Sequence, residues 1–127
     1  MKKYLWFILF GFLPGCDPGH FGRSFIYNKT GYQLRLQYHT QARDSLILIE
    51  ANSYTEVYKF GGLGAGKDYK CCSCEYLSII LQPSDTFRQL VKDITKSNNW
   101  NITNTNHRRF SSHEITCDFV VDSSDIQ

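Results

Sequence analysis

The chain of 127 residues carries 14 basic and 12 acidic side chains, a formal net charge of +2, and 15% of its residues are aromatic. This length suits one ordinary domain and leaves too little chain for two. Lys2 and Lys3 precede an apolar N-terminal run, so the rest of the chain is neutral, which argues against a nucleic-acid partner because such a partner requires a basic face. The many aromatic residues suit strands better than helices.

The N-terminus has the order of a secretory signal, with Lys2 and Lys3 followed by an apolar run over residues 4–13. As a helix this run would be about 15 Å long, half the hydrocarbon thickness of a bilayer, so it is too short to span one. The residues Leu13-Pro14-Gly15-Cys16 resemble the lipobox of bacterial lipoproteins. The resemblance implies removal of residues 1–15 and a diacylglyceryl thioether on Cys16. The alternative is an ordinary signal peptide, with Cys16 unmodified.

An acylated Cys16 would tether the domain to a membrane, because each buried methylene contributes about 0.8 kcal/mol and two or more chains hold stably. Asp17 resembles the signal that retains enterobacterial lipoproteins in the inner membrane, but other bacterial groups do not follow that rule, so the inner and the outer membrane both stay open. We expect the domain in the periplasm or at the cell surface. Residues 16–23 are predicted as the lipidated cysteine and a flexible tether, and residues 24–127 as a single β-rich domain.

Several stretches are predicted as strands. Residues 32–39 alternate Tyr, Leu, Leu and Tyr with Gln, Arg, Gln and His, which is typical of a strand with one wet face. Residues 112–121 alternate in the same way, and residues 45–50 (SLILIE) form an apolar run typical of a buried strand. The remaining candidates are residues 24–29, which lead into an Asn–Gly turn, residues 54–60, whose two faces are mixed, and residues 75–82, which end at Pro83.

Residues 61–68 (GGLGAGKD) come within one residue of a phosphate-binding loop. Asp68 stands where that motif requires a magnesium-binding Ser or Thr, and its carboxylate would repel phosphates. The residues after this loop show no helical pattern, so no helix N-terminus is predicted that could bind an anion. We therefore predict a flexible glycine loop, with no nucleotide and no other cofactor.

Residues 84–97 have the pattern of a short helix. Ser84 and Asp85 suit a helix cap. The apolar residues after them recur at i, i+3, i+4 and i+7 and are Phe87, Leu90, Val91 and Ile94. A tertiary context that forces this stretch into strands is the alternative, and the Asn- and Thr-rich residues 100–106 are predicted to be irregular.

These patterns predict an all-β domain, a small antiparallel β-sandwich or open barrel with one short helix. The lipobox and short tether, the turn at residues 28–31 before an alternating strand, Trp100, and a closing strand that ends near Asp122 look like the small uncharacterised lipoproteins of Bacteroidetes. That resemblance implies no activity.

Four cysteines besides Cys16 form an even set in a chain with an export signal, namely Cys71, Cys72, Cys74 and Cys117. Three pairings are open. Pairing Cys71 with Cys72, or Cys72 with Cys74, closes a very tight ring, so we favour Cys71–Cys74 with Cys72–Cys117. The second of these bridges would contribute about 4 kcal/mol in the chain-entropy model.

The same cysteines allow a working thiol site. Cys71 and Cys74 have the two-residue spacing of redox pairs and zinc ligands, and His113 shares a strand face with Cys117. Cys71, Cys74, Cys117 and His113 could therefore form a metal site, or Cys71 and Cys74 alone could exchange disulfides.

No catalytic constellation stands out, because none of the histidines (His20, His39, His107 and His113) lies near a patterned nucleophile or carboxylate. The leading hypothesis is a lipid-anchored, non-enzymatic interaction or structural module of the cell envelope, with an envelope protein or a glycan as its partner. Recognition would fall to the aromatic-bearing strands and to residues 61–66. The second hypothesis is the envelope thiol protein.

Overall fold

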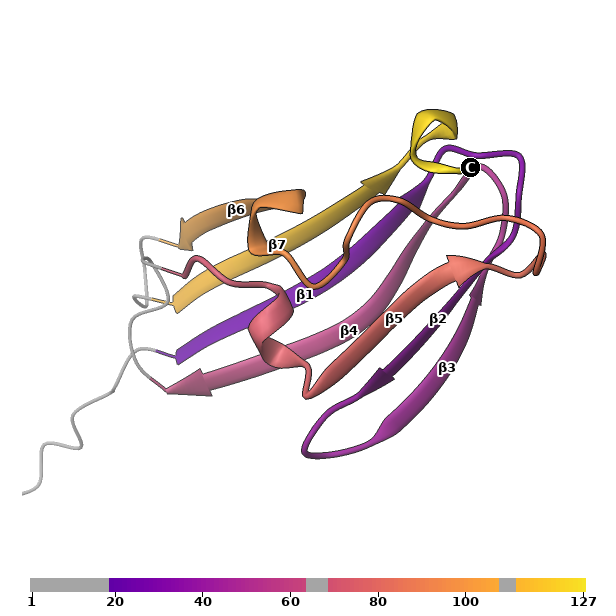
Figure 1. The fold of residues 1–127 in the computed structure, drawn as a ribbon. Helices are drawn as coiled ribbons and strands as arrows, with labels where there is room; N and C mark the ends of the chain where they lie inside the picture. Colours follow the sequence, from indigo (N-terminus) through magenta and orange to yellow (C-terminus); the bar gives the residue numbers. More distant parts are fainter. Residues whose placement is uncertain (1–18, 64–68, 108–111) are drawn as a thin grey trace, which may run out of the picture.

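The computed structural model describes residues 19–63, 69–107 and 112–127, which form a small all-β sandwich (Figure 1). Within these ranges one sheet has four strands in the order β4-β1-β7-β6, and the other has three in the order β3-β2-β5. The strands are β1 Gly19–Asn28, β2 Leu34–His39, β3 Asp44–Ile49, β4 Ser53–Leu63, β5 Ser78–Pro83, β6 Trp100–His107 and β7 Ser112–Val121. Three short 3-10 turns are η1 Ser73–Glu75, η2 Ser97–Asn99 and η3 Ser123–Asp125.

The predicted sandwich is confirmed, but it is not antiparallel throughout. Each neighbouring pair of the described strands is antiparallel except β1 and β7, which run parallel with His20 opposite His113 and Asn28 opposite Val121. Parallel neighbours need a long connection. Most of the domain separates β1 from β7, so nothing in the local sequence constrains their relative direction.

Strand β1 begins earlier than the sequence predicts. It starts at Gly19, so residues 19–23, expected as part of the tether, belong to the sheet. Strand β1 pairs with β4 from Gly19 and with β7 from His20, and these ladders of backbone hydrogen bonds offset the weak strand preference of Gly19 and Gly22. Gly22 also has a packing role, because a Cβ there would overlap the ring of Phe60.

A bulge in β4 explains why both of its faces look mixed in the sequence. Ser24 pairs with Tyr58 while Phe25 pairs with Glu56, so Val57 is an extra residue in the ladder. The bulge reverses which alternate residues of β4 face the core. Tyr54 and Glu56 point outward before it, and Tyr58 packs against the core after it.

Strand β3 is not buried on both faces, contrary to the prediction for residues 45–50. Ile49 is fully buried, but Leu46 is 63% and Leu48 54% exposed. Strand β3 is an edge strand, and in the described structure the outer face of its sheet is uncovered. An apolar run alone does not distinguish a strand with two buried faces from one with a single buried face.

The predicted helix at residues 84–97 is absent from the structure, and no described helix is long and apolar enough to cross a membrane. Asp85 and Asp93 instead accept hydrogen bonds from the amides of Phe87 and Thr95, each at 2.9 Å, and so form turns. Such local bonds compete with a helix. The segment then pairs with the C-terminus through a bridge between Leu90 and Ile126.

The expectation of irregular structure at residues 100–106 is wrong as well. These residues lie in β6, which pairs with β7 from Trp100 opposite Phe119 onward. The ring of Trp100 packs on Phe119 at 5.2 Å, and its Nε1 donates to the Ile94 carbonyl oxygen at 2.8 Å. Tertiary pairing thus outweighs the low strand preference of Asn.

The core lies between the sheets and extends under two segments that are not strands. The three-stranded sheet is narrower than the four-stranded one, and residues 69–77 and 84–99 lie along the side that it leaves open (Figure 1). Cys72 is bonded to Cys117 of β7, which ties the first segment to the core. The second is held by Ile94, which is buried, and by Lys92, whose Nζ donates to the Val120 carbonyl oxygen at 2.7 Å.

Candidate functional site

The outer face of the four-stranded sheet carries exposed aromatic rings. Alternate residues of β1 point outward and place Phe21, Phe25 and Tyr27 on this surface, and Tyr54 of β4 lies opposite Tyr27. Phe21 is 44%, Tyr27 38% and Tyr54 54% exposed. We call these four residues the aromatic face. Scattered apolar side chains are ordinary on a surface, but a contiguous group of large ones marks an interaction site.

Three rings of the aromatic face, those of Phe25, Tyr27 and Tyr54, hold one another in place. Phe25 and Tyr54 are stacked, with centroids 4.7 Å apart and planes within 6°. Tyr27 meets Tyr54 edge-on at 5.8 Å. Such pairs contribute about 0.2–1 kcal/mol each across strands, which stabilises the sheet and also fixes the rings in advance of any contact with a partner.

Two cations lie over these rings. The guanidinium of Arg23 is 5.7 Å from the centroid of Phe25, and the ammonium of Lys29 is 4.8 Å from that of Tyr27. Arg23 lies at an outward position of β1, and Lys29 directly follows the last residue of that strand. The strand and the residue after it therefore present an alternation of aromatic and basic side chains along one face.

Acidic residues of the flanking strands pair with Arg23 and with Tyr54. Arg23 Nη2 donates to Glu114 Oε1 at 2.6 Å, which raises the pKa of the guanidinium, and Arg23 Nη1 lies 3.8 Å from Glu56. The Tyr54 hydroxyl donates to Asp118 Oδ1 at 2.6 Å. Partial burial, together with this hydrogen bond, raises the pKa of Tyr54 to about 12. At neutral pH the face thus combines neutral rings with the ion-paired Arg23 and with the ammonium of Lys29 over Tyr27.

The outer face of the three-stranded sheet is different in character. A shallow hollow of about 440 Å³ lies between Leu46 and Ile80, over the polar residues Arg35 and Gln37 of β2. At one end His39 is hydrogen-bonded to Asp44. Tyr38 also lines the hollow, but its ring is buried and pairs with Tyr58 and Tyr76, so it does not form an exposed ring pair like that of the aromatic face.

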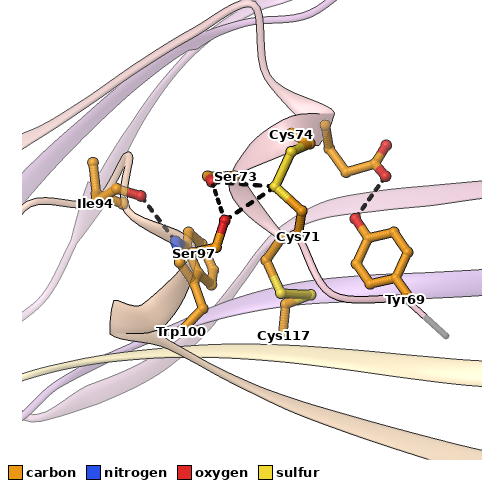
Figure 2. Close-up of a disulfide and its surroundings, with 10 residues drawn as sticks. Tyr69, Cys71, Ser73, Cys74, Ile94, Ser97, Trp100 and Cys117 are labelled. Atoms are coloured by element: carbon orange, nitrogen blue, oxygen red, sulfur yellow. Dashed lines mark hydrogen bonds between the residues drawn. A yellow bond between two sulfur atoms is a disulfide. The ribbon is translucent and has the colours of Figure 1, made fainter.

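The cysteines form the pairing that the sequence favours. Cys71 is bonded to Cys74, with Cα atoms 5.4 Å apart, and Cys72 to Cys117, with Cα atoms 5.9 Å apart (Figure 2). The two disulfides differ in burial. Cys72 and Cys117 are both 0% exposed, whereas Cys71 is half-buried and Cys74 is exposed.

Two hydroxyl groups lie beside the surface disulfide. Ser97 Oγ is 3.1 Å and Ser73 Oγ 3.6 Å from Cys71 Sγ, and the two oxygens are 3.2 Å apart (Figure 2). A disulfide sulfur carries no hydrogen, so the hydroxyl groups donate. The distances fit a chain in which Ser73 donates to Ser97 and Ser97 donates to Cys71.

The predicted metal set of Cys71, Cys74, Cys117 and His113 is not assembled. Both disulfides occupy the sulfurs, and His113 is buried at the start of β7. The described part of the chain holds no group of three or more His, Cys, Asp or Glu residues placed to bind a metal ion.

Other predicted elements fall partly or wholly outside the described residues. Cys16 and the lipobox do so entirely, and so do residues 64–68 of the glycine loop. Gly61 and Gly62 belong to β4, where Gly61 pairs with Phe21. The described part of the expected recognition loop is therefore the end of a strand.

The individual members of the aromatic face were not predicted from the sequence, although a signal for them exists. Phe21, Arg23, Phe25, Tyr27 and Lys29 alternate with small or apolar residues, which is a strand pattern. The glycines at positions 19 and 22 favour a flexible tether in a sequence-based prediction, so the strand pattern was missed there.

The chain matches no protein family model, no curated protein and no solved structure.

Proposed function

We propose that the protein is a lipid-anchored, non-enzymatic binding module of the bacterial cell envelope, and that the aromatic face docks a partner protein. The observation that carries the proposal is the exposed cluster of stacked rings on β1 and β4, with Arg23 and Lys29 over it. The sandwich supplies the rigid support.

The composition of the face favours a protein partner. Tyr, Phe and Arg are enriched at the centres of protein interfaces, where a few such residues carry most of the binding energy. The paired charges of Arg23, Glu56 and Glu114 would form a polar rim that accepts complementary charges from the partner. Rings already fixed by stacking lose little conformational entropy on binding.

The proposed anchor defines an orientation for the domain. Gly19, the first residue of β1, comes three positions after Cys16, and an extended chain of that length reaches about 10 Å. The end of the sandwich where β1 and β7 begin and β4 ends would thus face the membrane. Strand β1 would carry the aromatic face away from the lipid, with Phe21 nearest to the membrane and Tyr27 farther out.

We expect Cys16→Ser to abolish acylation and to release the protein from membranes. The measurement is the intact mass of membrane-extracted protein, together with its distribution between the membrane and soluble fractions. Cys74→Ser, which removes a cysteine within the domain, serves as the control and should leave acylation unchanged. An unacylated wild-type protein would contradict the anchor.

Site-specific photo-crosslinking tests the docking face. A photoreactive phenylalanine analogue at Phe21 should yield a defined protein adduct in intact cells, identified by mass spectrometry. The matched control is the same analogue at Phe87, which is 94% exposed in the segment 84–96, outside the aromatic face. We expect the double variant Tyr27→Ser/Tyr54→Ser to bind the identified partner about 30-fold more weakly at unchanged fold, the loss typical of interface hot spots.

Two results would overturn this proposal. Adducts that form equally at Phe21 and Phe87, or at neither, would exclude the aromatic face as a protein docking site. Retention of the protein on purified cell-wall polysaccharide, sensitive to Tyr27→Ser/Tyr54→Ser and without any protein adduct, would replace the protein partner with a glycan.

A further inference from the structure

We infer that the surface disulfide Cys71–Cys74 exchanges with an external dithiol, which attacks Cys74 Sγ and expels Cys71 as a thiolate, while Cys72–Cys117 remains intact. This inference concerns a site separate from the aromatic face and does not depend on the proposed function. It rests on the accessibility of the two bridges, on the hydroxyl groups beside Cys71 and on the different sizes of the loops that the bridges close.

Accessibility separates the two disulfides. Exchange requires an incoming thiolate to approach one sulfur along the direction of the bond. Cys74 is exposed on η1, whereas Cys72 and Cys117 are 0% exposed beneath it. An external thiol can therefore reach Cys74 in the folded protein but must unfold part of the domain to reach the buried bridge.

The hydroxyl groups identify the leaving sulfur. Ser97 Oγ, at 3.1 Å from Cys71 Sγ, makes a weak hydrogen bond to a neutral disulfide sulfur and a stronger one to a thiolate. Ser73, at 3.2 Å from Ser97, supports that bond. Among the described residues, both hydroxyl contacts to this disulfide are made to the sulfur of Cys71. A stabilised leaving thiolate accelerates exchange, so cleavage proceeds with Cys71 departing.

Reduction of the Cys71–Cys74 disulfide consumes one external dithiol. Its first thiolate forms a mixed disulfide with Cys74 Sγ as the Cys71–Cys74 bond breaks and Cys71 leaves as a thiolate. Its second thiolate then attacks the external sulfur of the mixed disulfide and releases the Cys74 thiolate. Two electrons pass to the protein, which gains two thiols after protonation, and the dithiol becomes a disulfide.

Opening the surface bridge leaves the fold in place. Cys71 and Cys74 are three positions apart, whereas Cys72 and Cys117 are 45 apart. Cross-links that close short loops constrain the unfolded chain least. Reduction would instead act locally, because the sulfur of Cys71 and the hydroxyl of Ser73 together connect η1 to Ser97 of the neighbouring segment.

Graded reduction of the full-length protein tests the inference. The protein is incubated with increasing dithiothreitol, quenched with acid, alkylated and mapped by peptide mass. We expect Cys71 and Cys74 to be labelled at dithiothreitol concentrations about tenfold below those that label Cys72 and Cys117, with the thermal transition still present. Labelling of all four cysteines together, or rearranged pairs, would overturn the inference.

Two sets of variants test the direction of cleavage. Ser97→Ala should slow opening about fivefold, the loss expected for one hydrogen bond, whereas Ser45→Ala in β3 should leave the rate unchanged. In addition, alkylation of the Cys71 thiol in Cys74→Ser should reach half of its maximal rate at a lower pH than alkylation of the Cys74 thiol in Cys71→Ser, because Ser97 stabilises the Cys71 thiolate. Equal opening rates in the serine comparison, or equal alkylation profiles of the two thiols, would refute the assignment of Cys71 as the leaving sulfur.

Discussion

Replacing the buried bridge with Cys72→Ala/Cys117→Ala is expected to lower the free energy of unfolding by about 4 kcal/mol, because this bridge restricts a long stretch of the unfolded chain. The sequence separation is 45 residues, and both cysteines are 0% exposed, so the change also leaves a small cavity. A domain of this size has a total stability of about 5–15 kcal/mol, so the loss is a large part of it. Denaturant unfolding measures the loss.

The matched control is Cys71→Ala/Cys74→Ala, which removes the other bridge. Its sequence separation is three residues, for which the same model gives about 2 kcal/mol. The Cys71–Cys74 variant should thus unfold at clearly higher denaturant than the Cys72–Cys117 variant. Equal losses would show that the buried bridge does not stabilise the fold in the way its loop length implies.

The second large effect is expected at Asn28, where Asn28→Ala should cost about 3 kcal/mol because it removes several hydrogen bonds of a fully buried side chain at once and takes the acceptor from the Thr30 amide. Asn28 is fully buried at the end of β1. Its Nδ2 donates to the carbonyl oxygens of Tyr32 at 2.7 Å and Glu50 at 2.9 Å. Its Oδ1 accepts from the Thr30 amide at 3.0 Å, so one side chain joins the turn after β1 to the end of β3.

Two further substitutions test whether the stability depends on the amide donor of Asn28 or on any polar side chain at this position. Asn28→Asp keeps an acceptor for Thr30 but presents a carboxylate to the carbonyl oxygens of Tyr32 and Glu50, so we expect a loss at least as large as that of Asn28→Ala. Asn101→Ala, at an exposed position of β6, should stay within about 0.5 kcal/mol of wild type. Thermal and denaturant unfolding report both values. An Asn28→Asp variant as stable as wild type would contradict the donor role of the Asn28 amide.

Asn28 shows which features follow from the local sequence and which require the tertiary structure. The Asn and Gly of residues 28–31 predict a turn, because both residue types favour turn conformations. The same residues do not reveal that the Asn28 side chain binds Glu50, which lies 22 positions away. The turn is thus predictable from local preference, while the bond that fixes its place in the domain is not.

The same division applies to the candidate sites. The cysteine pairing follows from covalent geometry, since adjacent cysteines bridge poorly and the alternatives close tight rings. Sequence spacing does not indicate burial, so the contrast between an exposed Cys74 and a buried Cys117 appears only in the structure. The aromatic face likewise requires β1 to pair with β4, which places Tyr54 against Phe25.

The sequence by itself determined the all-β class, the alternating strands β2 and β7, and the two disulfides, because side-chain periodicity and covalent geometry act over short distances. Only the tertiary structure decided the extension of β1, the bulge in β4, the exposed face of β3 and the loss of the helix at residues 84–97. Each of these depends on which distant strand supplies backbone hydrogen bonds and apolar cover. Local preferences are too weak to outweigh that choice.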